Sequence, residues 1–81
     1  MNKKEFEKQW NSIKRKIKLI NLECNGYRMT RIFTDSYKYR VYGVSLFVEF
    51  YFHKYLIAVV FIKDISMISE GSLFNEVDKN E

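Results

Sequence analysis

Only the first quarter of this chain has the apolar periodicity of an α-helix. Its large apolar residues recur at steps of four, three, four and three: Phe6, Trp10, Ile13, Ile17 and Ile20. At the helical rotation per residue they lie within about 80° of arc, which makes one buried stripe. Asn2, followed three residues later by Glu5, matches a capping box. These features predict a helix over 3–18 whose stripe packs into the core.

The end of this helix has two interpretations. In one, the helix continues to Cys24 and Gly26 ends it in a left-handed conformation. In the other, a strand begins near Leu19 and Asn25-Gly26 makes a tight turn into a second strand. We favour the hairpin, because Asn-Gly between two alternating runs is the strongest short-range hairpin pattern.

The rest of the chain is rich in the β-formers Tyr, Val, Ile, Phe and Thr. We expect a turn at 34–36 and a tight turn at 53–54, with Gly43 as a bulge or bend inside a strand that 44–52 continues. The predicted fold is α+β: an N-terminal amphipathic helix packed on an antiparallel β-sheet of three to five strands. The predicted single domain, 1–81, comprises three parts: helix 3–18 (to 24 in the first interpretation), antiparallel strands 19–68, and acidic tail 69–81 with a short helix at 72–77.

The segment 55–62 is apolar on both of its faces. Tyr55, Ile57, Val59 and Phe61 alternate with Leu56, Ala58, Val60 and Ile62. One helix covers one face of a sheet, and a chain of 81 residues has a thin core. We therefore expect the second face to meet the tail, a partner or another copy of the chain, which makes a homodimer possible.

The formal net charge of +4 is unevenly distributed. Residues 1–40 hold eleven Lys and Arg against four acids, and residues 41–81 hold three Lys against six acids. A basic front half favours an acidic partner. The single cysteine suggests a reducing compartment, and no long apolar run suggests a membrane span, so we expect a cytoplasmic protein.

Catalytic, metal and cofactor sites are not expected. The chain has one His and one Cys, His53 and Cys24, and three isolated glycines. His53 falls in a predicted turn and Cys24 at the end of a helix or strand, where a small buried thiol is ordinary. A structural zinc site needs four ligands, and a phosphate loop needs glycines in series. We expect a protein that is not an enzyme.

Binding of a protein or ribonucleoprotein is the leading hypothesis, because six Tyr and seven Phe exceed what a thin core encloses. The predicted contact residues are Tyr37, Tyr39, Arg40, Tyr42, Phe47 and Tyr51. The alternative is nucleic-acid binding through cations interleaved with aromatic residues. Its candidate residues are Lys4, Lys8, Arg15, Lys18, Arg28, Arg31 and Lys38.

In length, lack of proline, and abundance of Lys, Asn, Ile, Phe and Tyr, the chain resembles small orphan proteins of phages and mobile elements in AT-rich bacteria. Many proteins of that type are stoichiometric inhibitors, anti-CRISPR and other anti-defence proteins among them. The resemblance implies inhibition of a larger partner by steric occlusion. Those inhibitors of this type that imitate nucleic acid have strongly acidic surfaces, whereas this chain is basic.

Overall fold

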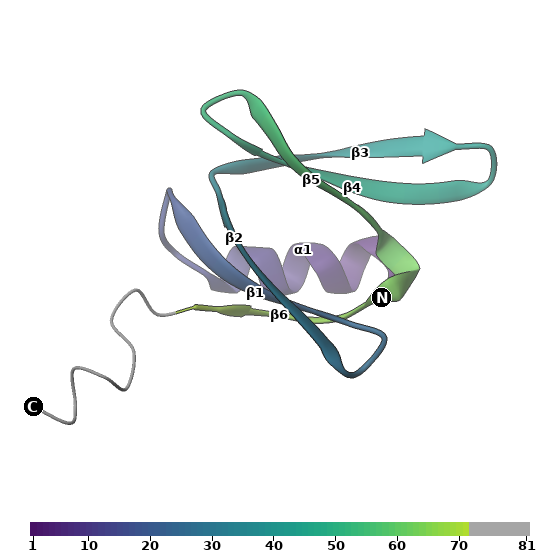
Figure 1. The fold of residues 1–81 in the computed structure, drawn as a ribbon, viewed down its shortest axis with the longest axis horizontal. Coiled ribbons are helices and arrows are strands. Elements are labelled where there is room, and N and C mark those ends of the chain that lie inside the picture. The colour runs from purple at the N-terminus through teal and green to yellow at the C-terminus, as the bar shows by residue number, and fades with distance from the viewer. Residues whose placement is uncertain (72–81) are drawn as a thin grey trace, which may run out of the picture.

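The structure is a computed structural model that describes residues 1–71. One helix precedes six strands that form two antiparallel sheets of three, which confirms the α+β class (Figure 1). The predicted helix at 72–77 lies outside the described residues. The elements in chain order are α1 (Lys3–Ser12), β1 (Lys18–Cys24), β2 (Arg28–Thr34), β3 (Ser36–Tyr42), β4 (Ser45–Phe52), β5 (Tyr55–Phe61), the 3-10 turn η1 (Ile62–Asp64) and β6 (Ile65–Glu70).

Helix α1 begins at the predicted capping box. The Glu5 backbone N–H donates to Asn2 Oδ1 at 2.8 Å, and the Asn2 N–H donates to Glu5 Oε1 at 3.1 Å. The helix ends at Ser12, six residues earlier than predicted. The Ser12 hydroxyl donates to the Gln9 carbonyl at 2.7 Å, and four of the next six residues are cations. Crowded like charges in 14–18 disfavour further helical turns.

The hairpin interpretation of Asn25-Gly26 is confirmed. β1 and β2 pair antiparallel from Lys18↔Thr34 to Cys24↔Arg28. Asn25 and Gly26 have φ of 56° and 77°, the left-handed values that a type I′ turn requires at both central positions. β1 also pairs with β6, so it is the central strand of its sheet.

In the second sheet, β4 lies between β3 and β5. The expectation that Gly43 bends a continuous strand is wrong, because β3 and β4 pair antiparallel and Tyr42 lies opposite Ser45. Gly43, with φ of 61°, lies in the turn that reverses the chain. The predicted tight turn at His53-Lys54 is confirmed, with both residues at positive φ between β4 and β5.

A single residue, Asp35, connects β2 of one sheet to β3 of the other, and η1 connects β5 back to β6. Its backbone N–H donates to the Tyr51 carbonyl at 2.9 Å, and the Thr34 hydroxyl donates to the same carbonyl at 2.8 Å. Asp35 Oδ2 accepts the backbone N–H of His53 at 3.0 Å. These bonds hold Asp35, where the chain passes from one sheet to the other, against the end of β4.

Helix α1 contacts both sheets. The Phe6 ring lies 4.8 Å from Tyr37 and 5.9 Å from Phe50, centroid to centroid, in the β3-β4-β5 sheet. Toward the other sheet, Gln9 Oε1 accepts the backbone N–H of Ile68 in β6 at 2.7 Å. The helix thereby holds the two sheets against one apolar core.

The predicted stripe is buried at four of its five positions. Phe6, Trp10, Ile13 and Ile20 are at most 8% exposed, and Ile20 reaches the core from β1. Ile17 is 47% exposed, so its assignment to the core is wrong. It lies beyond the end of α1, where the helical period no longer applies.

Candidate interaction face

The β3-β4-β5 sheet has one side turned toward α1 and one side turned away from it, which we call the outer face. Side chains alternate between the two sides of a strand, so the register assigns each paired residue to one side. Besides Ser36 and Ser45, the residues of the outer face are Lys38, Arg40 and Tyr42 from β3, Phe47, Glu49 and Tyr51 from β4, and Leu56, Val59 and Phe61 from β5. None of them belongs to the buried apolar core cluster of the described residues.

An aromatic row crosses all three strands of the outer face. The ring centroid of Phe47 lies 5.3 Å from that of Tyr42 and 5.3 Å from that of Phe61. Tyr42 is 55% exposed, and the other two rings are half-buried. The row presents apolar surface with a tyrosine hydroxyl at one end, and tyrosine is enriched in protein interfaces.

At the centre of the outer face, Glu49 is bonded by two of its neighbours. Arg40 Nε donates to Oε2 at 3.1 Å, and the Tyr51 hydroxyl donates to Oε1 at 2.8 Å. The Glu49 side chain is only 5% exposed, because neighbours on the same face cover it. The hydrogen bond from Tyr51, followed by those from Arg40, lowers the pKa of the Glu49 carboxyl. Its charge is therefore compensated within the chain.

The strand β3 adds positive charge beside this network. Lys38 Nζ lies 5.3 Å from the centroid of the Tyr51 ring, and both Lys38 and Arg40 are exposed. On the opposite side of Glu49, Leu56 and Val59 of β5 are 52% and 45% exposed. The outer face thus combines an apolar half on β4 and β5 with a cationic border on β3.

Four of the six predicted protein contacts meet on the outer face: Arg40, Tyr42, Phe47 and Tyr51. Tyr37 and Tyr39 lie on the other side of β3, half-buried against α1. The Tyr39 hydroxyl donates to Glu7 Oε2 at 2.6 Å, and burial followed by this bond raises the pKa of Tyr39.

Sequence reasoning did not include Leu56, Val59 and Phe61 among the contact residues. The doubly apolar pattern of 55–62 already placed unshielded side chains there. Which of them share a face with Tyr42 follows only from the register across β4.

The structure separates the seven candidate nucleic-acid contacts. Lys4 and Lys8 lie on α1, Arg28 and Arg31 on opposite sides of β2, and Lys38 on the outer face. Two further candidates have partners within the chain. Arg15 Nε lies 3.2 Å from Glu70 Oε2, and the amine of the buried Lys18 donates to the Arg15 carbonyl and lies 4.9 Å from the Trp10 ring.

His53 belongs to a turn of the β3-β4-β5 sheet, whereas Cys24 belongs to a strand of the other sheet. His53 occupies the β4–β5 turn, with Nδ1 3.9 Å from Asp35 Oδ2. Cys24 is 3% exposed at the end of β1, and burial raises the pKa of its thiol. Among residues 1–71, no three His, Cys, Asp or Glu side chains come together in a way that would hold a metal ion.

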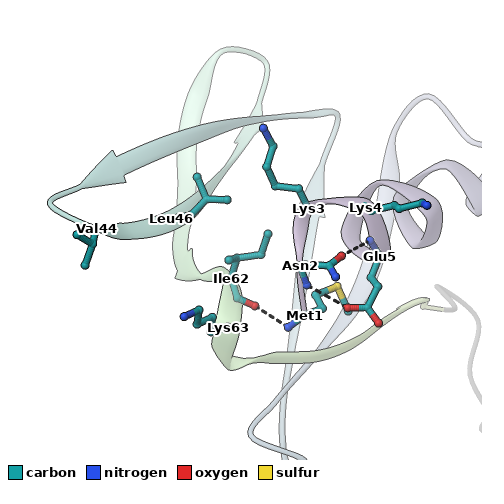
Figure 2. A pocket seen from close by; sticks show the side chains of 9 residues that line it. All are labelled: Met1, Asn2, Lys3, Lys4, Glu5, Val44, Leu46, Ile62 and Lys63. Carbon is teal, nitrogen blue, oxygen red and sulfur yellow. Dashed lines mark hydrogen bonds between the residues drawn. The ribbon is translucent and has the colours of Figure 1, made fainter.

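Two depressions flank the β3-β4-β5 sheet. One, of about 270 Å³, separates residues 58–61 of β5 from Arg28, Thr30 and Ile32 of β2. The other, of about 860 Å³, lies between the start of α1 and the β3–β4 turn, with Leu46 and Ile62 in its lining (Figure 2). The Met1 ammonium in this second depression already donates to the Ile62 and Ile65 carbonyls at 3.0 and 2.8 Å.

Comparison of the chain with protein-family models, with curated proteins and with solved structures finds no significant match. Across residues 1–71, none of the helices has the length and apolar character needed to cross a membrane.

Proposed function

We propose that this chain is a small non-catalytic binding protein that docks its outer face on an acidic protein surface. By occupying that surface it inhibits or modulates a larger protein or ribonucleoprotein through steric occlusion. A phage-encoded inhibitor of host defence or host machinery, acting in the host cytoplasm, is an example of this type of protein.

The observation that carries the proposal is the partly exposed aromatic row beside a cationic border. Tyr42, Phe47 and Phe61 form an apolar centre, and Lys38 and Arg40 stand at its edge. Interfaces place aromatic residues and arginine at their energetic centre and charges at the rim.

The charge of the outer face indicates the chemistry of the partner. Glu49 is already compensated by Arg40 and Tyr51, which leaves Lys38 as an uncompensated charge and gives the face a net positive charge. A partner with carboxylates around an apolar patch matches this arrangement, and complementary charge raises the association rate and the specificity.

The test is affinity capture with a matched pair of variants. Tyr42→Ser removes the exposed end of the aromatic row, and Tyr27→Ser makes the same change at the β1–β2 turn, where Tyr27 is 83% exposed. A protein captured from the encoding organism is purified, and its affinity for each variant is measured by titration calorimetry.

We expect Tyr42→Ser to weaken binding by about tenfold or more, as for an interface hot spot, and Tyr27→Ser to leave it within about twofold. Lys38→Glu should also weaken binding, mainly through slower association. Equal affinities for Tyr42→Ser, Lys38→Glu and the unmodified chain would refute the proposal.

Nucleic-acid binding is the second candidate, because the same face interleaves Lys38 and Arg40 with Tyr42 and Tyr51. Cations beside exposed aromatic rings are the elements of a single-strand binding surface. A titration of random DNA and RNA at several salt concentrations separates the two candidates, since phosphate contacts weaken steeply as salt rises. Absence of binding at low salt eliminates this second candidate.

A further inference from the structure

We propose that the free edge of β5 pairs with β5 of a second copy of this chain, so that the two β3-β4-β5 sheets join into one. This inference concerns the edge of the sheet and is independent of the partner proposed for the outer face.

Within residues 1–71 the two sheets have four edge strands, β2, β6, β3 and β5, which differ in how they are protected against pairing with another chain. The β6 edge is bonded to α1, because Gln9 accepts the Ile68 N–H. The β2 edge carries Arg28 and Arg31, and the β3 edge carries Lys38 and Arg40. Charged side chains, covering helices and β-bulges are among the devices by which edge strands avoid pairing with other chains.

The β5 edge has no charged side chain and no covering helix among residues 1–71, and a bulge at Ile57 is its one irregularity. Tyr55–Phe61 contains no charged residue and no proline, and within residues 1–71 only β4 pairs with it. Tyr55, Leu56 and Ile57 are 74%, 52% and 44% exposed, although all three are large and apolar. Figure 1 shows the β4–β5 turn lying away from β1 and β6. On its β4 side the turn meets the end of β2, where the Phe52 ring lies 6.4 Å from that of Phe33 and the His53 N–H bonds Asp35.

The register shift at Ile57 indicates where the proposed contact between the two β5 strands is centred. β4 pairs Phe50 with Ala58 and Tyr51 with Leu56, so the register passes over Ile57. The extra residue of a bulge has no partner in the adjacent strand, and a second strand on the free side can supply one. Beyond Ala58 the free side faces the depression beside β2. The accessible length is therefore centred on Ile57.

A second copy is the occupant that the chemistry of β5 favours. Two strands related by a two-fold axis run antiparallel, and every residue then meets the same segment of the other copy. β5 is apolar on both sides and uncharged, so it matches itself without repulsion. The β2 and β3 edges would instead bring like charges together, which is destabilising.

The test is sedimentation equilibrium from about 10 µM to about 1 mM, a range that suits a short interface. We expect the mean mass to rise from that of one chain toward that of two. Ile57→Lys places like charges at the axis and should weaken association by about tenfold or more. Val41→Lys, at a 63% exposed position in β3, is the matched control and should leave association unchanged.

A mixing experiment shows whether the variant is merely misfolded. Ile57→Lys and Ile57→Glu should each be monomeric, and an equimolar mixture should recover the dimer, because Lys faces Glu across the axis. A single-chain mass for the unmodified protein at every concentration overturns the proposal and indicates that the bulge protects the edge. A dimer that Ile57→Lys leaves intact also overturns it. The Tyr42→Ser variant should dimerise like the unmodified chain, although it should bind the partner of the outer face more weakly. Failure of the dimer proposal and failure of the proposed function can therefore be told apart.

Discussion

Phe6 is the residue on which the contact between helix and sheet depends most. It is fully buried, and its ring lies within 4.8 to 6.1 Å of the rings of Tyr37, Phe50, Trp10 and Tyr39. Replacing such a residue by Ala costs about 3–5 kcal/mol. A domain of this size has roughly 4–12 kcal/mol of stability in total.

We therefore predict that Phe6→Ala lowers the urea midpoint of unfolding strongly, whereas Ile17→Ala changes the unfolding free energy by less than about 1 kcal/mol. Ile17 is 47% exposed despite its place in the apolar stripe of the sequence. Urea unfolding followed by tryptophan fluorescence measures both variants. A larger loss of unfolding free energy for Ile17→Ala than for Phe6→Ala would contradict the assignment of Phe6 to the core and of Ile17 to the surface.

A second residue-scale prediction concerns acid stability. The bonds from Tyr51 and Arg40 lower the folded-state pKa of Glu49 below the unfolded value of about 4.3. The folded state then binds fewer protons than the unfolded state, so the stabilisation is complete above about pH 4.3 and is lost as pH falls through the folded pKa.

We predict that Glu49→Gln removes this part of the acid dependence, which urea unfolding between about pH 3 and about pH 7 would detect. Glu70→Gln is the control, because Glu70 pairs with Arg15 at the surface, where ion pairs contribute little. An acid dependence identical in Glu49→Gln and the unmodified protein would contradict the prediction.

At the scale of elements, two tight turns with similar backbones carry different residues. Asn25-Gly26 and His53-Lys54 both have positive φ at their two central positions, with 77° at Gly26 and 70° at Lys54. A β-carbon added at Gly26 would meet no atom within 4 Å, so any cost is backbone strain. Left-handed φ costs an ordinary L-residue about 1–2 kcal/mol.

We predict opposite effects at these two turns. Gly26→Ala should lower the unfolding free energy by about 1 kcal/mol, and Lys54→Gly should raise it by up to about 1 kcal/mol. Thermal unfolding of both variants, followed by circular dichroism, gives the comparison. Two changes of the same sign would indicate that packing rather than φ determines the stability of these turns.

The elements that sequence predicted correctly are those with local causes. Asn2 and Glu5 cap α1, and Asn25-Gly26 turns β1 into β2, each through bonds or dihedral angles confined to a few residues. The end of α1 was missed because Ile13 and Ile20 satisfy a helical stripe and are also buried after the chain becomes extended. A helix of this length is marginal alone, so tertiary contacts decide where it stops.

The division into two sheets depends on long-range contacts at Asp35, which the local pattern of the sequence does not reveal. Asp35 turns the chain because the carbonyl of Tyr51 and the N–H of His53, sixteen and eighteen residues away, bond to it. The same long-range register decides that Tyr42 belongs to the outer face, and that Tyr39 faces α1. The tyrosine surplus was visible in the sequence, but its distribution between the two sides was not.

At the scale of the whole molecule, the formal charge of +4 acts differently on the two proposed contacts. Docking of the outer face on an acidic partner brings opposite charges together, and salt screens that attraction. Pairing of β5 with a second copy brings two positively charged molecules together through an uncharged strand. Salt there screens a repulsion and leaves the apolar contact intact.

We therefore predict salt responses of opposite sign for the two contacts. Raising NaCl from about 50 mM to about 500 mM shortens the screening length from about 14 Å to about 4 Å. Affinity for the acidic partner should fall, and the self-association constant measured by sedimentation should rise. Lys38→Glu is the informative variant, because it lies on the outer face and away from β5. It should reduce the salt dependence of partner binding and leave the sign of the self-association response unchanged. Self-association that weakens with salt would mean that ion pairs, rather than the uncharged edge of β5, hold the two copies together.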